Sequence, residues 1–193
     1  MKKKQLLSSL LFTSLALFIP ANTLVAKNVC DTIALKHDSM TVGNPILPGF
    51  HADPEILYSN KTGKYYIYST TDGIPGWGGY KYYVYSSADL KTWKNEGVAL
   101  DASTDQISWA NGNLWAPAAV EVKLKNGSYK YYLYFSARPN DNGRKQMGVA
   151  VSDSPTGPFV DLGKPLLAKN HPGCHGQLID VDVFIDPVSN KPY

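Results

Sequence analysis

An internal repeat constrains the fold of this 193-residue chain more than any other feature. The segment Lys64-Tyr65-Tyr66-Ile67-Tyr68 recurs 66 residues later as Lys130-Tyr131-Tyr132-Leu133-Tyr134. The same offset takes Trp93 to Phe159, which predicts that both of these aromatic residues belong to the core. One repeat is long enough for about four short strands. The chain is therefore predicted to be all-β and assembled from repeated four-stranded sheets.

The strands are predicted from tyrosine-rich runs at residues 65–69, 82–86 and 131–135, which are separated by Gly, Asn, Asp and Pro. Lys61-Thr62-Gly63-Lys64 and Lys125-Asn126-Gly127-Ser128 are typical of hairpin turns. No long stretch shows the period of 3.6 residues that marks an amphipathic helix, so helices are expected to be minor.

A third unit begins near the end of the sequence. Asp53-Pro54-Glu55-Ile56-Leu57 maps onto Asp180-Val181-Asp182-Val183-Phe184 at an offset of 127, and Lys64 and Tyr66 map onto Lys191 and Tyr193. Four-stranded units repeated around an axis are the blades of a β-propeller, and the smallest propellers have about four blades. We expect blades at about 44–107 and 108–173, the start of a third blade at 174–193, and a gene product that is truncated relative to a closed ring.

The first residues have the pattern of a secretory signal peptide. Lys2, Lys3 and Lys4 precede the apolar run 6–20, and small residues lead up to Ala26. The apolar run is shorter than the ~20 residues of a membrane span. We predict a signal peptide at 1–26, a leader at 27–43, and a secreted or periplasmic protein. Without the signal peptide the formal net charge falls from +3 to 0, so nothing favours a nucleic-acid partner.

Cysteine and histidine are too sparse to predict a metal site. Cys30 and Cys174 are the two cysteines, and export makes a disulfide between them possible. Neither forms a cluster at zinc-binding spacing, and His171 and His175 beside Cys174 are too few as ligands. No cofactor is expected.

Two aspartates are the candidates for chemistry. Asp53 lies among apolar residues directly before Pro54, and Asp180 occupies the same place in the third unit. At the offset of 66 the equivalent residue of the second unit is Ala119. Since the innermost strand of each blade lines the central channel, both carboxylates are expected to face one pocket, as glycosidic cleavage requires. A turn-forming or capping role is the alternative, and recurrence at matched positions favours the catalytic one.

Three motifs in order resemble glycoside hydrolase family 43: residues 44–56, Trp115-Ala116-Pro117 and residues 179–186. The resemblance implies a five-bladed β-propeller, of which this chain holds about two and a half blades. It also implies an inverting glycosidase acting on arabinose- or xylose-containing polysaccharide of the plant cell wall. Asp53 matches the general base. Asp180 matches the aspartate that modulates the pKa of the general acid, and Asp182 is the alternative for that role.

The general acid of the family is a glutamate, and none of the three glutamates in this sequence matches it. Glu55 and Glu121 are related by the offset of 66, which favours structural roles for both. We therefore expect the chain alone to be inactive. A noncatalytic carbohydrate-binding propeller or an inert remnant is the alternative. In a complete protein, the resemblance allows an ion on the propeller axis.

Aromatic residues are candidates for binding the sugar. Phe50 and His51 flank the general base, Trp115 is placed to stack on a sugar ring, and Trp77 lies in a glycine-rich loop at the expected rim of the pocket. The sequence indicates no protein partner.

Overall fold

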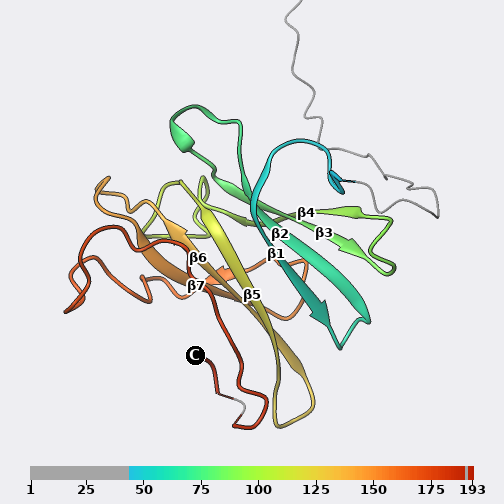
Figure 1. Ribbon diagram of the computed structural model, residues 1–193. Coiled ribbons are helices and arrows are strands. Elements are labelled where there is room, and N and C mark those ends of the chain that lie inside the picture. Colours follow the sequence, from blue (N-terminus) through green and yellow to red (C-terminus); the bar gives the residue numbers. More distant parts are fainter. Residues whose placement is uncertain (1–43, 190) are drawn as a thin grey trace, which may run out of the picture.

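The computed structural model describes residues 44–189 and 191–193 as two four-stranded antiparallel sheets followed by an extended segment (Figure 1). The strand order is β1-β2-β3-β4 in the first sheet and β5-β6-β7-β8 in the second. The all-β prediction is confirmed. The elements are β1 His51–Ser59, β2 Lys64–Thr71, the 3₁₀ turn η1 Pro75–Trp77, β3 Lys81–Ser87, β4 Lys94–Asp101, β5 Trp115–Lys123, β6 Tyr129–Ala137, β7 Gln146–Ser152 and β8 Val160–Asp161.

The two predicted hairpin turns are present. Gly63 has φ +66°, and its N–H donates to the carbonyl of Ser59 at 2.8 Å. Gly127 has φ +83°, and its N–H donates to the carbonyl of Leu124 at 2.9 Å. A residue with a Cβ resists this left-handed conformation, which explains why glycine closes both turns.

The main core lies between the two sheets, with β1 packed along β5 (Figure 1). Tyr68 and Leu133 are fully buried there, and the Tyr68 hydroxyl donates to the carbonyl of Pro155. Ile67 faces the other side of the first sheet, in a smaller cluster that contains Trp93. Burial of Trp93 and Phe159, which are 3% and 1% exposed, confirms the prediction that both are core residues.

The strand register corrects one step of the repeat alignment. Glu55 pairs with Tyr68 in the first sheet, and Ala118 pairs with Tyr134 in the second. The two tyrosines are equivalent at the offset of 66, so Glu55 is equivalent to Ala118 and not to Glu121. The first strands are thus related by an offset of 63.

The length of the hairpins explains this change of offset. Between equivalent strand positions the first hairpin contains residues 60–63, and the second contains residues 123–129. The second hairpin is three residues longer. Ala116 therefore takes the place of Asp53 in the second sheet, and the prediction of Ala119 is wrong.

The third segment starts a sheet with the same register as the first. Phe184 and Tyr193 exchange backbone hydrogen bonds of 2.9 and 2.8 Å, as expected if they correspond to the pair Leu57 and Tyr66 at the offset of 127. A bridge between Ile185 and Pro192 follows. The sequence mapping of Tyr193 onto Tyr66 is confirmed.

Several predictions fall outside the described residues or are not decided by them. The signal peptide at 1–26, the leader at 27–43 and Cys30 lie outside the described residues. The exact blade boundaries and the number of blades in a ring stay predictions. Within the described ranges, no helix is both long enough and apolar enough to cross a membrane.

Candidate active site

Three residues with left-handed backbone mark the same point in the three units. The φ angles are +47° at Asp53, +41° at Ala116 and +58° at Asp180. Non-glycine residues rarely adopt such angles, and each costs on the order of 1–3 kcal/mol. Their recurrence shows that this conformation belongs to the repeat. Only the first and third units place a carboxylate on it.

A β-bulge accompanies this position in both complete sheets. The ladder shifts between Ala52 and Glu55 in β1, and between Trp115 and Ala118 in β5. A bulge breaks the alternation of side chains and redirects the residue that it contains. The bulge thus turns the Asp53 side chain out of the strand pattern, and Asp53 is exposed.

Thr70 connects Asp53 to the second sheet. Its hydroxyl donates to Asp53 Oδ2 at 3.4 Å and accepts the N–H of Ala116 at 2.9 Å. Tyr82 is fully buried nearby and donates its hydroxyl to the carbonyl of Trp115 at 2.9 Å. Burial raises the pKa of Tyr82 well above its usual value, and the negative charge of Asp53 raises it further. These contacts hold Asp53 against the start of β5.

Glu55 and Asp182 form a second pair of acids at equivalent positions. Partial burial raises the pKa of Glu55, the like charge of Asp182 raises it further, and a backbone hydrogen bond from Ala119 opposes the shift. The negative charge of Asp182 in the third unit therefore acts on the carboxyl group of Glu55 in the first. The equivalent residue of the second sheet is Ala118, which carries no charge.

Asp180 is exposed and lines a cavity of about 380 Å³ together with Asp182. The other side of this cavity is formed by the second sheet, where Tyr134 and Met147 contribute side chains. Asp53 is not among the residues that line it. The structure thus places Asp180 beside a cavity that Asp53 does not line, and the interaction between the first and third units is the electrostatic effect of Asp182 on Glu55.

Trp115 and Trp77 come together as a unit. The indole N–H of Trp115 donates to the carbonyl of Trp77 at 2.8 Å, and the Asn113 amide donates to the same carbonyl at 2.8 Å. Trp77 itself is 81% exposed. The ammonium of Lys145 lies 3.5 Å from the centroid of the Trp115 ring. The predicted rim residue is therefore attached to the predicted stacking residue through its backbone.

Phe50 and His51 differ in their surroundings. Phe50 is 73% exposed and available for contact with a ligand. His51 Nε2 lies 2.9 Å from the carbonyl of Pro48, and Nδ1 lies 3.0 Å from the Ser69 hydroxyl. Since a carbonyl only accepts, Nε2 donates and Nδ1 accepts in the neutral ring. Both nitrogens of His51 thus bond within the protein.

The described part of the chain holds no group of three or more His, Cys, Asp or Glu side chains placed to bind a metal. Cys174 Sγ lies 3.6 Å from His171 Nδ1 in an exposed loop, and Cys174 forms no disulfide with any residue of the described ranges. The axial ion implied by the resemblance finds no ligand set among these residues.

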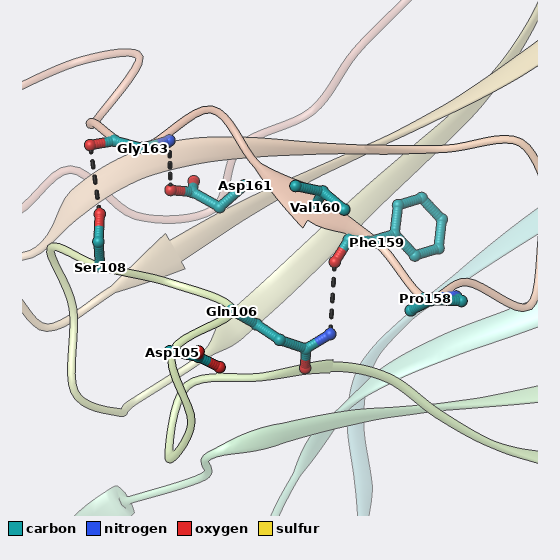
Figure 2. Close-up of a pocket in the computed structure, with 8 residues that line it drawn as sticks. All are labelled: Asp105, Gln106, Ser108, Pro158, Phe159, Val160, Asp161 and Gly163. Carbon is teal, nitrogen blue, oxygen red and sulfur yellow. Dashed lines mark hydrogen bonds between the residues drawn. The ribbon is translucent and has the colours of Figure 1, made fainter.

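A separate cavity of about 270 Å³ lies where β8 meets the loop that joins the two sheets (Figure 2). Asp161 accepts the N–H of Gly163 at 2.7 Å, and the Ser108 hydroxyl donates to the carbonyl of Gly163 at 3.3 Å. The Gln106 amide donates to the carbonyl of Phe159 at 3.4 Å. These polar groups bond to one another and stabilise the edge of the second sheet, apart from Asp53 and Asp180.

The sequence of residues 42–193 matches the family profile described as Glycosyl hydrolases family 43. The chain belongs to this family. An arabinoxylan arabinofuranohydrolase of Bacillus subtilis is 34% identical to it over 162 residues, which are 70% of this chain and 29% of that protein. A xylosidase/arabinosidase of Bacteroides ovatus is 36% identical over 133 residues, which are 63% of this chain and 38% of that protein.

Solved structures of family 43 enzymes share the fold. A β-xylosidase/α-arabinofuranosidase from a compost microbial metagenome is 34% identical, with a TM-score of 0.60 over 77% of this chain and 43% of the other. The Bacillus subtilis enzyme in complex with cellotetraose is 32% identical, with a TM-score of 0.61 over 75% of this chain and 32% of the other. The chain thus spans less than half the length of these relatives.

Thr70, Tyr82, Lys145 and Glu55 were missed from the sequence as residues of the site. Thr70, Tyr82 and Lys145 carry no local signal, because their roles depend on contacts with residues that are distant in the sequence. The pairing of Glu55 with Asp182 had a signal, since the offset of 127 relates them as it relates Asp53 to Asp180. The incorrect equivalence of Glu55 with Glu121 concealed it.

Proposed function

We propose that this protein is a glycoside hydrolase of the inverting type that acts on arabinose- or xylose-containing polysaccharide. Asp53 is the general base and Asp180 modulates the pKa of the general acid, with Asp182 as the alternative for the second role. The recurrence of an acid on the left-handed bulge position, in a member of family 43, is the observation that carries the proposal. The relatives are arabinofuranosidases and xylosidases by name, which supports the substrate class.

The surroundings of Asp53 support the base role. The carboxylate is exposed to water, and Thr70 donates one hydrogen bond that orients it. A general base in this position takes a proton from water as the water attacks the anomeric carbon from the face opposite the leaving group. Inverting enzymes leave room for that water by separating the acid and the base by about 6.5–9.5 Å. Phe50, His51, Trp77 and Trp115 are proposed to line the sugar subsite.

The role of Asp53 as general base can be tested without a general acid if the substrate carries a leaving group that needs no protonation. 2,4-Dinitrophenolate leaves a glycoside without being protonated, whereas the sugar leaving group of an oligosaccharide must be protonated by a general acid. No glutamate of this sequence matches that acid. The expected inactivity of the chain is thereby narrowed to substrates whose leaving group must be protonated: we expect no hydrolysis of xylotriose or arabinotriose, and slow hydrolysis of 2,4-dinitrophenyl arabinofuranoside or xyloside. Asp53→Asn is expected to lower the rate with the dinitrophenyl glycosides roughly 10²–10⁴-fold.

The alternative function makes a different prediction. A noncatalytic carbohydrate-binding protein would bind xylotriose or arabinotriose and leave the dinitrophenyl glycosides intact. An unchanged rate in Asp53→Asn would remove the base role. Oligosaccharide hydrolysis that depends on Asp53 would show that a described residue serves as the acid.

We also propose that the protein is exported. The proposal is supported by Lys2, Lys3 and Lys4 ahead of an apolar run and by the small residues that end at Ala26. Mass spectrometry of the protein recovered from the producing cells should show an N-terminus near residue 27. An intact N-terminus would contradict export through cleavage.

A further inference from the structure

Lys145 is a buried lysine without an acidic partner. Its exposed fraction is 7%. In the part of the chain that the structure describes, no carboxylate forms an ion pair with it, and its charged neighbour is the cation Arg138. Burying an ammonium group without a carboxylate partner carries a large desolvation free energy, so we expect another contact to stabilise the Lys145 side chain.

The compensating contact is with Trp115. Lys145 Nζ lies 3.5 Å from the centroid of the Trp115 ring and 3.4 Å from the carbonyl of Asn113. Burial, together with the charge of Arg138, lowers the pKa of Lys145 to about 8. The edge of the same indole is held by Trp77 through the 2.8 Å hydrogen bond from Nε1. The ring is thus fixed both at its face and at its edge.

The backbone of Lys145 extends the connection toward Asp180. Its N–H donates to the Gln177 side chain at 2.6 Å, and its carbonyl accepts the N–H of Leu178 at 3.2 Å, two residues before Asp180. On the other side, Trp115 directly precedes Ala116, whose N–H bonds to Thr70 beside Asp53. Lys145 therefore lies between the segments that carry the two aspartates.

We propose that Lys145 is a positioning residue that fixes the indole of Trp115 in the orientation needed to stack on the sugar ring. The inference rests on the proposed function, because it takes Trp115 as the stacking surface. An aromatic ring that is already immobilised loses less conformational freedom when a ligand binds, and the complex is correspondingly tighter. A desolvated cation–π contact is strong enough to supply this immobilisation.

Two substitutions separate positioning from packing. Lys145→Met keeps the length of the side chain and removes the charge, whereas Lys145→Arg keeps a cation that can contact the ring. Calorimetric titration of the 193-residue protein with xylotriose and with arabinotriose gives the dissociation constants. We expect Lys145→Met to weaken binding roughly tenfold and Lys145→Arg to stay within about threefold of the wild type.

Measuring the Tm of each variant distinguishes a loss of affinity caused by a mobile Trp115 ring from one caused by destabilisation of the fold. Replacing an unpaired buried charge with an apolar side chain is often neutral or stabilising, so Lys145→Met should keep or raise the Tm while it loses affinity. The ε-methylene protons of Lys145 should show an upfield ring-current shift in the NMR spectrum of the wild type. This signature does not require that the methionine variant fold.

These measurements distinguish failure of the Lys145 inference from failure of the proposed function. Wild-type affinity in Lys145→Met, equal losses in the Met and Arg variants, or unshifted ε-protons would each overturn the positioning role. Trp115→Ala is the matched control. If Trp115→Ala binds both trisaccharides as tightly as the wild type, the stacking role in the proposed function fails. If only Trp115→Ala loses affinity, the Lys145 inference alone fails.

Discussion

The first and second sheets have the same backbone conformation at the start of their first strands, but different side chains at these positions. Both place a bulge and a left-handed residue at the start of the first strand. The first sheet has Asp53 and Glu55 at this bulge, and the second has Ala116 and Ala118. The bulge is therefore a feature of the repeat, and the acidic side chains distinguish the first unit from the second.

The same two sheets place glutamates in opposite environments. Glu121 lies over the first hairpin, where it accepts the hydroxyl of Tyr131 at 2.8 Å, the N–H of Asn60 at 2.8 Å and the hydroxyl of Ser59. Partial burial opposes ionisation of Glu121, but these hydrogen bonds outweigh it and lower its pKa. The pKa of Glu55 is raised by burial and by Asp182. The structure favours the ionised form of Glu121 and disfavours that of Glu55.

Moving the carboxylate between sheets gives the largest expected effect. The double variant Asp53→Ala/Ala116→Asp transfers the acid to the equivalent left-handed position of the second sheet. We expect hydrolysis of the dinitrophenyl glycoside to fall roughly 10²–10⁴-fold, as in a simple loss of the base, because the proposed function assigns the base to Asp53 and not to position 116. The Tm should fall, because Ala116 is buried and a carboxylate at this position loses its hydration, although aspartate tolerates the backbone conformation. Retained activity would show that the two positions are interchangeable.

Truncating equivalent core residues tests the packing difference between the sheets. Leu133 is fully buried between the sheets, whereas Ile67, its equivalent, packs in the smaller cluster on the far side of the first sheet. Leu133→Ala should cost about 3–5 kcal/mol and Ile67→Ala about 2–3 kcal/mol of unfolding free energy. Urea denaturation measures both. A larger loss for Ile67→Ala would contradict the assignment of the main core.

Glu121→Gln tests the hydrogen bonds over the first hairpin. We expect a loss of about 1–3 kcal/mol at pH 7, reduced from the full value of charge-assisted bonds because the site is partly exposed. A lowered pKa gives stability that is present above the unfolded value and lost as the pH falls through the folded value. The difference between wild type and variant should therefore shrink below about pH 4.5. A difference independent of pH would show that the charge has no role.

Glu55→Gln is the counterpart of Glu121→Gln in the first strand. We expect it to have the smallest effect on the free energy of unfolding, and to stabilise the protein where Glu121→Gln destabilises it. A raised pKa means that the ionised form is disfavoured by folding, so the penalty is absent at low pH and grows as the pH rises through the folded value. We expect the variant to be more stable than the wild type at pH 7 by less than about 1 kcal/mol, and equal to it near pH 3. Destabilisation at pH 7 would show that the ionised Glu55 makes a favourable contact instead.

Much of the fold could be predicted from local sequence. The tyrosine-rich runs became β2, β3 and β6, both glycine turns formed, and Trp93 and Phe159 are core residues. Alternation, turn chemistry and aromatic burial act over a few residues, so a single sequence displays them. Family membership followed from three short motifs and is confirmed over residues 42–193.

The equivalence of the first strands could not be predicted in this way. The second hairpin is three residues longer, and the offset measured from β2 and β6 therefore does not apply to β1 and β5. Side chains alternate with a period of two, so an error of three residues exchanges the two faces of a strand. That is why Glu121 was matched to Glu55, although the two residues have unrelated surroundings.

The sequence by itself determined the repeat, the strands and the two aspartates that recur at an offset of 127. Only the tertiary structure decided which residues surround them. The hydrogen bond from Thr70 to Asp53, the effect of Asp182 on the pKa of Glu55 and the contact of Lys145 with Trp115 each join residues that are separated in the chain. Such contacts depend on how whole sheets pack, and packing is set by summed burial and register rather than by any local pattern.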